Sequence, residues 1–258
     1  MPKFSANLSF LYPDLSFAER FAAAAKDGFK AVEYLGPYDL PAEEVAELLA
    51  ENGLEQALFN VPSGDWAGGE RGIACLPDRV EEFREGVETA IRYAEALGCK
   101  RLNVIAGLAP QGISSEVLET TLVENLRHAA SRVKQAGIRL LIEPINLRDI
   151  PGFFLSRTDH AERILEKVGS DNIFIQYDFY HMQVMQGDLV ATFERLKDRI
   201  AHIQIADNPG RNEPGTGEIN YPFIFETLDR LGYDGWVGCE YKPKAGTGAG
   251  LGWAGGRI

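Results

Sequence analysis

Eight short apolar runs recur along the chain, and helix-like stretches separate them. The runs are rich in β-branched and aromatic residues, which is typical of strands buried on both faces. In chain order they are KFSANLS (3–9), AVEYL (31–35), QALFN (56–60), RLNVIAG (101–107), RLLIEP (139–144), IFIQYD (173–178), AHIQIAD (201–207) and GWVGCEY (235–241). This pattern predicts eight strands that alternate with helices.

Residues with known capping preferences mark the ends of the helix-like stretches. A glycine just past a helix end commonly adopts the left-handed conformation that closes the helix. Glycines in this position are Gly28, Gly53, Gly98, Gly137, Gly169 and Gly232. At the helix starts, Ser16 with Glu19 fits a capping box, Pro41 fits a first-turn proline and Ser114 fits an N-cap.

The alternation of strands and helices predicts an α/β protein, a single (β/α)8 TIM barrel over residues 1–258. An open doubly wound sheet usually has fewer strands, and no G-x-G-x-x-G motif opens a helix here. No linker-like segment divides the 258 residues, a length that one closed barrel commonly has. In such barrels the active-site groups lie at the C-terminal ends of the strands.

Polar side chains follow the last four predicted strands at those ends. The fifth and the eighth strand run into Glu143, just before Pro144, and into Glu240. The sixth and seventh strands, between them, carry Asp178 and Gln204. Consecutive strands are neighbours in a barrel, so these residues form one arc, in which carboxylates repel unless a cation lies among them. An all-oxygen set suits Mg²⁺ or Mn²⁺ better than Zn²⁺. Each carboxylate could instead cap a helix or form an ion pair; further strand-end candidates are Glu33, Asn60 and Asn7.

Four histidines are present, and two of them fall near the arc. His181 comes three residues after Asp178, where the turning chain could bring its ring over the barrel mouth. His202 comes two residues before Gln204, so we expect it on the same face of the strand, one layer deeper. The other two lie in helical stretches and are expected to be packing or surface residues: His128 and His160.

Two loops are candidates for substrate binding. Residues 206–221 (ADNPGRNEPGTGEINY) contain Arg211, and arginine is the natural bidentate partner of a substrate carboxylate, although a solvated loop charge is the alternative. Residues 60–77 (NVPSGDWAGGERGIACLP) are long and glycine-rich, as lids and binding loops often are. We therefore predict substrate-binding roles for Glu70 and Arg71, which this loop carries next to Trp66.

Charge and cysteine content narrow the classes of partner. The formal net charge of −12 argues against nucleic acid or an anionic membrane, which call for a basic face. Three cysteines without metal-ligand spacing suggest a reducing compartment. There is no signal-peptide pattern and no apolar run long enough to cross a bilayer. We expect a cytoplasmic protein, for which the sequence leaves a homo-oligomer open.

The sequence resembles the hydroxypyruvate isomerase family of the xylose-isomerase-like barrels nearly end to end. The most specific stretches are FSANLSFLY, GDWAGGERGIACLP, LLIEPIN, IQYDFYHMQ, HIQIADNPGRNEPGTGEINY and GWVGCEYKP. The resemblance implies that Glu143 and Glu240 transfer protons, and that His181 and Arg211 contact substrate. It implies a divalent metal on Glu143, Asp178, Gln204 and Glu240. In related ketose epimerases a histidine takes the place of Gln204, so their metal preference does not carry over.

The activity that the resemblance implies is the interconversion of hydroxypyruvate and 2-hydroxy-3-oxopropanoate (tartronate semialdehyde) through an enediolate. Alternatives on the same barrel are a 2-oxo-tetronate isomerase and a ketose 3-epimerase. A metal-dependent phosphodiesterase or nuclease would resemble a histidine-rich multi-zinc site, which four histidines and a charge of −12 disfavour. A non-catalytic sugar-binding barrel would require Glu143 and Glu240 to lie too far apart to share one substrate.

Overall fold

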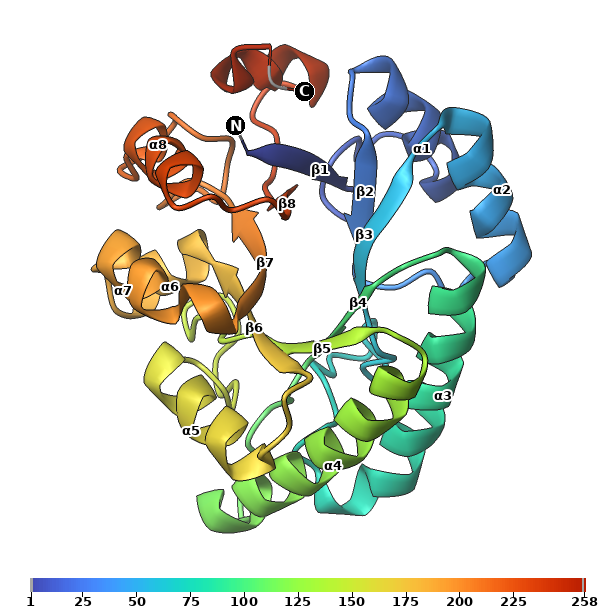
Figure 1. The fold of residues 1–258 in the computed structure, drawn as a ribbon, viewed down its shortest axis with the longest axis vertical. Helices are drawn as coiled ribbons and strands as arrows, with labels where there is room; N and C mark the ends of the chain where they lie inside the picture. The colour runs from blue at the N-terminus through green and yellow to red at the C-terminus, as the bar shows by residue number, and fades with distance from the viewer. Residues whose placement is uncertain (1, 257) are drawn as a thin grey trace.

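The computed structural model describes residues 2–256 and 258 and contains a closed barrel of eight parallel strands (Figure 1). Each strand pairs with the next along the chain, and the last pairs with the first. The predicted (β/α)8 TIM barrel is therefore confirmed. The strands are β1 (Lys3–Asn7), β2 (Ala31–Tyr34), β3 (Glu55–Asn60), β4 (Arg101–Val104), β5 (Arg139–Ile142), β6 (Ile173–Asp178), β7 (Ile200–Ile205) and β8 (Trp236–Cys239).

Helices form a ring around the barrel (Figure 1). Two α-helices follow β6, whereas a 3₁₀ helix, η3 (Gly248–Ala254), stands where an eighth α-helix was expected after β8. Two further 3₁₀ helices are η1 (Pro77–Arg79) and η2 (Lys197–Arg199). The α-helices are α1 (Phe17–Lys26), α2 (Ala42–Asn52), α3 (Val80–Ala96), α4 (Ser115–Gln135), α5 (Thr158–Val168), α6 (Phe179–Met185), α7 (Leu189–Leu196) and α8 (Tyr221–Arg230).

The predicted helix ends agree with the structure except at one residue. The carboxylate of Glu19 accepts the backbone N–H of Ser16 at 2.9 Å, and the hydroxyl of Ser114 caps α4. Pro41 lies immediately before α2 rather than in its first turn, because its ψ of 144° is extended. The six glycines that follow helices all have positive φ, as expected of left-handed caps: Gly28, Gly53, Gly98, Gly137, Gly169 and Gly232.

Most of the apolar core lies between the strands and the surrounding helices. Helix α5 illustrates the packing, because Ala161, Ile164, Leu165 and Val168 follow the i, i+3, i+4, i+7 spacing and are all buried. Burying one aliphatic side chain of this size contributes about 1.5–3 kcal/mol. The barrel therefore provides a stable frame for the groups that its strands carry.

Inside the barrel, a separate apolar cluster lies below a polar layer. The cluster contains Leu58, Leu141 and Ala201. Leu58 precedes Asn60 by two residues and Leu141 precedes Glu143 by two, so each pair shares the inner face of its strand at successive depths. The polar groups are thus held at the C-terminal end of the barrel, above an apolar filling.

Candidate active site

A small cavity lies at the C-terminal ends of the strands. Its volume is about 50 Å³, which is room for roughly three to five waters at about 10–15 Å³ each. Glu143 follows the last residue of β5, Glu240 follows the last residue of β8, and both line the cavity together with Gln204 of β7. Asp178 ends β6 and is in register with Gln204. The arc expected from the sequence is therefore present.

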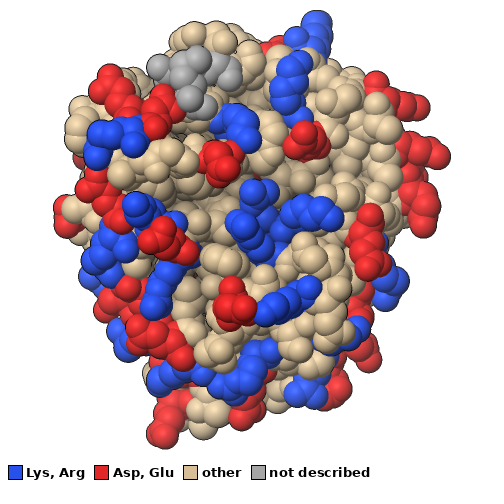
Figure 2. Space-filling model, in the orientation of Figure 1, with Lys and Arg blue, Asp and Glu red and all other residues tan. Residues whose placement is uncertain are grey.

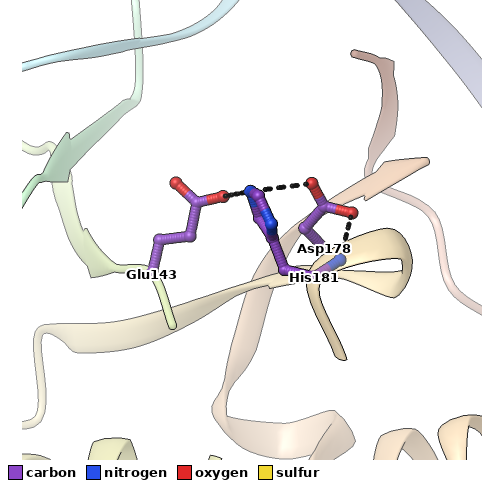
Figure 3. Close-up of side chains that lie close together, drawn as sticks. All are labelled: Glu143, Asp178 and His181. Atoms are coloured by element: carbon purple, nitrogen blue, oxygen red, sulfur yellow. Dashed lines mark hydrogen bonds and ion pairs between the residues drawn. The ribbon is translucent and has the colours of Figure 1, made fainter. Parts of the chain in front are cut away.

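Two acids and one imidazole converge beside this cavity (Figure 3). Nε2 of His181 lies 3.8 Å from Oε1 of Glu143 and 3.6 Å from Oδ2 of Asp178. Both of these oxygens are buried and have no hydrogen-bond partner among the described residues. The other oxygen of Asp178 accepts the backbone N–H of Tyr180 at 2.7 Å, so Asp178 caps α6 while it faces the site. Buried, unpartnered carboxylate oxygens of this kind fit a hard divalent cation.

The pKa values of the acids are raised in this pocket. Burial raises the pKa of Glu143 well above its ordinary range, and the charges of Glu240 and Asp178 raise it further. Burial is also the main cause that raises the pKa of Glu240 to about 8, against the opposing charge of Arg211. The pKa of Asp178 rises to about 6, again chiefly through burial. A bound cation would relieve this repulsion, and it would compete with protons for the same oxygens.

His181 is held as a neutral imidazole with a defined tautomer. Burial depresses its pKa well below the ordinary value, and the charges of Arg211 and Arg148 add to this effect. The backbone N–H of Asp149 donates to Oδ1 of Asn146 at 2.7 Å, so Nδ2 of Asn146 is the atom 2.6 Å from Nδ1 of His181. The backbone N–H of Asn146 also faces Nδ1, at 3.5 Å, so both donors make Nδ1 the acceptor and place the proton on Nε2. The contact that opposes this tautomer is longer than the amide contact, with Nη2 of Arg211 at 3.5 Å from Nε2. His181 therefore presents an N–H donor to the site.

Arg211 reaches into the site from the loop after β7. Its guanidinium lies between the rings of Phe10, at 4.8 Å, and Tyr180, at 5.1 Å. Nη2 donates to Oε1 of Glu240 at 2.5 Å, and Nη1 lies 3.5 Å from Asp149. The backbone φ of Arg211 is +53°, a conformation uncommon outside glycine, and it shows that the loop holds this residue tightly. A substrate carboxylate in the cavity would meet this guanidinium.

The loop that presents Arg211 is organised around one buried acid. The carboxylate of Asp207 accepts the backbone N–H groups of Gly215 at 2.8 Å, Gly217 at 2.9 Å and Ile219 at 3.0 Å. A side chain on Gly217 would collide with the carbonyl oxygen of Asn208, 2.0 Å from the position of its Cβ. The turn residues of this loop therefore form a fixed support instead of a mobile segment.

Gln204 and Asn7 both hold Glu240. Nε2 of Gln204 donates to Oε2 of Glu240 at 2.7 Å, and Nδ2 of Asn7 donates to the same oxygen at 2.8 Å. The amide oxygen of Gln204 accepts from Gln176 at 2.7 Å. Metal binding by Gln204 would require its amide to turn over, which would break its hydrogen bonds to Glu240 and Glu33. Gln176 would have to turn as well, so that its buried, unpartnered Oε1 could accept from the turned amide.

Glu70 and Arg71 do not line the cavity, although a substrate-binding role was expected for both. Glu70 binds Arg79 at 2.5 Å and the backbone N–H of Asp65 at 2.6 Å. Arg71 lies 4.4 Å from the Trp66 ring and donates to the carbonyl oxygens of Trp66 and Glu70. Their contacts shape the glycine-rich loop, and it is Trp66 that reaches the cavity wall.

Several residues of the site carried too weak a sequence signal to be assigned a role. Asn103 donates from Nδ2 to Oε2 of Glu143 at 3.1 Å, and Asn146 sets the tautomer of His181. His202 was expected one layer deeper and is indeed fully buried, where it contacts Glu33 at 2.8 Å. His128 and His160 lie in helices α4 and α5, as expected.

The raised pKa values predict how the stability of the metal-free protein depends on pH. Glu240 has a pKa near 4.5 when unfolded and about 8 when folded, so the folded state binds more protons between these values. Its contribution to stability is full below about pH 4.5 and is lost as pH rises towards 8. We expect the free energy of unfolding in chelator to fall across this range, by up to about 1.4 kcal/mol per pH unit for each such group, and Tm measured by calorimetry to fall with it. The Glu143→Gln, Glu240→Gln double variant should show a flatter profile; an unchanged slope would contradict the assignment.

Comparisons with known proteins identify the family to which the chain belongs. It belongs to the xylose isomerase-like TIM barrel family, whose pattern it matches over residues 21–255. It is an isomerase of this family. Hydroxypyruvate isomerase of Escherichia coli (strain K12) is 55% identical over 98% of both chains, and 2-oxo-tetronate isomerase of Cupriavidus necator is 51% identical over 98% of this chain and 97% of the relative. A crystal structure described as AP endonuclease, family 2, from Brucella melitensis is 44% identical, with a TM-score of 0.96 over 99% of this chain and 98% of that chain.

Proposed function

We propose that the protein interconverts hydroxypyruvate and 2-hydroxy-3-oxopropanoate by proton transfer between two glutamates. The observation that carries the proposal is that Glu143, Glu240 and Arg211 line one cavity of about 50 Å³. The two glutamates and the arginine can therefore act on one substrate. The 55% identity to a hydroxypyruvate isomerase supports the proposed substrate. Because Glu143 and Glu240 line the same cavity, a non-catalytic sugar-binding barrel, which would require them to lie far apart, is disfavoured.

The reaction moves a carbonyl from C2 to C3 of the three-carbon acid. One glutamate removes a proton from C3, which leaves an enediolate across C2 and C3. A proton is then delivered to C2, and the hydroxyl proton on the C3 oxygen passes to the C2 oxygen, so that C3 becomes the aldehyde and C2 carries the hydroxyl. A positioned general base or acid typically contributes 10²–10⁴-fold to each transfer. A bound metal would lower the pKa of Glu240 from its metal-free value of about 8, so that its carboxylate is ready to accept a proton near neutral pH.

The other polar groups orient the substrate and oppose the charge that develops on it. The Nε2–H of His181 would donate to an oxygen of the enediolate, where a preorganised donor favours the transition state over the ground state. Arg211 would bind the carboxylate with two parallel hydrogen bonds. Phe10 and Tyr180 on either side of its guanidinium would keep it in place.

A divalent metal, Mg²⁺ or Mn²⁺, is part of the proposal. Its ligands would be Glu143, Asp178, Gln204 and Glu240, and the unpartnered oxygens of Glu143 and Asp178 support this set. Glu143, Asp178 and His181 have ligand atoms within 4.8 Å of one another. We assign His181 to the substrate instead, because its Nε2 carries a proton. When bound, the metal would withdraw charge from the substrate oxygens and make the C3 proton more acidic.

A 2-oxo-tetronate isomerase is the second candidate, favoured by the 51% identity to such an enzyme. It would use the same groups on a substrate one carbon longer. A ketose 3-epimerase has weaker support, because the relatives at 55% and 51% identity are a hydroxypyruvate isomerase and a 2-oxo-tetronate isomerase. The endonuclease description belongs to the Brucella protein, and the net charge of −12 opposes nucleic acid as a partner here. Acidic and basic side chains are interspersed on the face drawn in Figure 2.

We further propose a cytoplasmic protein with a small keto acid as its substrate. The three cysteines are free and buried, which agrees with a reducing compartment. No helix among the described residues is both long and apolar enough to cross a membrane. Whether copies of the chain associate stays open, as it did from the sequence.

A substrate panel tests the proposed function. Hydroxypyruvate, 2-oxo-tetronate and free ketoses are assayed with added Mg²⁺ or Mn²⁺, and kcat/KM is compared. We expect the highest kcat/KM for hydroxypyruvate. A higher value for the four-carbon acid would replace the first candidate with the second, and turnover of ketoses alone would contradict both.

The role of Arg211 is tested by Arg211→Ala. Loss of hydrogen bonds to a charged group should weaken substrate binding by about 1.5–3 kcal/mol, a rise in KM of roughly 10- to 150-fold. Because Arg211 also binds Glu240, a fall in kcat should accompany it. Arg163→Ala, which removes an exposed arginine of α5, is the matched control. An unchanged kcat/KM would show that another group binds the carboxylate.

A further inference from the structure

Beneath the cavity lies a completely buried acid, Glu33 of β2, which is not among the residues that line the cavity. Four side chains surround its carboxylate: Ser5 at 2.7 Å, His202 at 2.8 Å, Gln204 at 2.8 Å and Asn7 at 3.3 Å. A buried carboxylate is destabilising unless such partners compensate it, and an apolar replacement is often as stable. Stability alone is therefore a poor explanation for placing a carboxylate here.

Two of these partners connect Glu33 to Glu240. Nδ2 of Asn7 and Nε2 of Gln204, which both contact Oε1 of Glu33, also donate to Oε2 of Glu240 at 2.8 and 2.7 Å. An amide nitrogen carries two hydrogens, so each can serve both carboxylates at once. Oε2 of Glu240 is thereby fixed towards the barrel interior, and Oε1 stays on the side of Arg211.

Strand β8, which lies on the other side of β1 from Glu33, leaves room for this arrangement. Gly238 lies two residues before Glu240 on β8, and a Cβ at this position would lie 2.2 and 2.4 Å from the two carboxylate oxygens of Glu33. Real side chains do not approach that closely, so any larger residue would displace the carboxylate. The strand that carries Glu240 thus accommodates Glu33 directly below it.

We infer that Glu33 is a positioning residue, which orients the carboxylate of Glu240 for proton transfer through the amide of Asn7, and also through that of Gln204 as long as the Gln204 oxygen is not bound to a metal. This inference rests on the proposed function for its kinetic effect. Misplacement of a reacting group by about 1 Å can lower a rate by roughly 10²-fold. Loss of the Glu33 carboxylate would free both amides to turn and would leave Glu240 without a fixed orientation.

The test compares Glu33→Leu with Asn7→Ala and with the double variant. Leucine offers no oxygen to either amide. We expect Glu33→Leu to lower kcat by about 10- to 100-fold, with KM within about threefold of wild type. Since both changes break one connection, the loss in the double variant should be smaller than the product of the two single losses. Losses that multiply fully, or a kcat within about twofold of wild type in folded Glu33→Leu, would overturn the inference.

A control separates positioning from general destabilisation. Asn125 lies on helix α4 and is not among the residues that line the cavity. Asn125→Ala removes its buried hydrogen bond to the carbonyl oxygen of Ala74. It should lower Tm while leaving kcat near wild type. If Glu33→Leu does not fold, Glu33→Asp is the second variant, because it keeps the charge but withdraws it by one methylene from the amides. It should also lower kcat, and an unaltered kcat would overturn the inference.

A crystal structure of the Glu33 variant gives an answer that does not depend on the substrate. We expect the Glu240 carboxylate to have turned, with at least one of its hydrogen bonds to Asn7 and Gln204 broken. An unchanged Glu240 would contradict the inference whatever the enzyme acts on. Wild-type protein that turns over no hydroxypyruvate would contradict the proposed function alone.

Discussion

Replacing either Glu143 or Glu240 by glutamine is expected to lower kcat by at least about 10²-fold, the lower end for a lost general base. Glutamine keeps the size of the side chain and an amide oxygen, but it cannot accept and return a proton at neutral pH. The two residues follow β5 and β8 and line the cavity from different strands. Each would therefore act at a different carbon of the planar enediolate, and neither would replace the other.

Steady-state kinetics with metal in excess measures this loss, and titration calorimetry checks that the variants retain some metal binding. Glu81→Gln, an exposed glutamate of α3 paired with Arg84, is the matched control and should leave kcat unchanged. Near-normal turnover in both Gln variants would favour a direct hydride shift between C2 and C3, which needs no carboxylate base.

Removal of divalent metal should abolish turnover, and Mg²⁺ or Mn²⁺ should restore it. Without a cation, the acids of the site have raised pKa values, chiefly through burial, with added repulsion from their neighbours. Glu143 and Asp178 also have buried oxygens without partners in the described part of the chain. A metal would supply the missing positive charge and also stabilise the charge on the enediolate.

Dialysis against chelator, elemental analysis and re-addition of single metals provide the measurement. Affinity for the metal should rise between about pH 6 and 8, because Asp178 and Glu240 must lose protons to bind it. Full activity in a preparation shown to be metal-free would remove the metal from the proposal.

The sequence predicts the barrel because its signals are local. Strand-like runs, glycine caps and alternation each depend on neighbouring residues, and strand ends locate Glu143, Asp178 and Glu240 at the mouth. The α-helix expected after β8 is replaced by the 3₁₀ helix η3, because the glycines of GAGLGWA disfavour a regular α-helix. Pro41 was misplaced by a single residue, at a helix boundary where local signals discriminate least.

Contacts between distant residues could not be predicted in this way. Asn146 sets the tautomer of His181 from 35 residues away, and His202 meets Glu33 across 169 residues. For Glu70 and Arg71 the local signal was present, because a charged, glycine-rich loop indicated substrate binding, but the contacts of the two side chains were not predictable from it. Their side chains instead satisfy groups of the loop itself and Arg79, a choice that only the folded loop determines.

The central claim is that two glutamates isomerise hydroxypyruvate through an enediolate, and ¹H NMR of the metal-loaded protein in D₂O tests it most directly. We predict that added hydroxypyruvate becomes 2-hydroxy-3-oxopropanoate with solvent deuterium at C2, at a rate that falls at least about 10²-fold in Glu143→Gln and Glu240→Gln. Absence of conversion above the protein-free rate would contradict the substrate. Conversion without deuterium at C2, at the same rate in both variants, would contradict the two-glutamate mechanism.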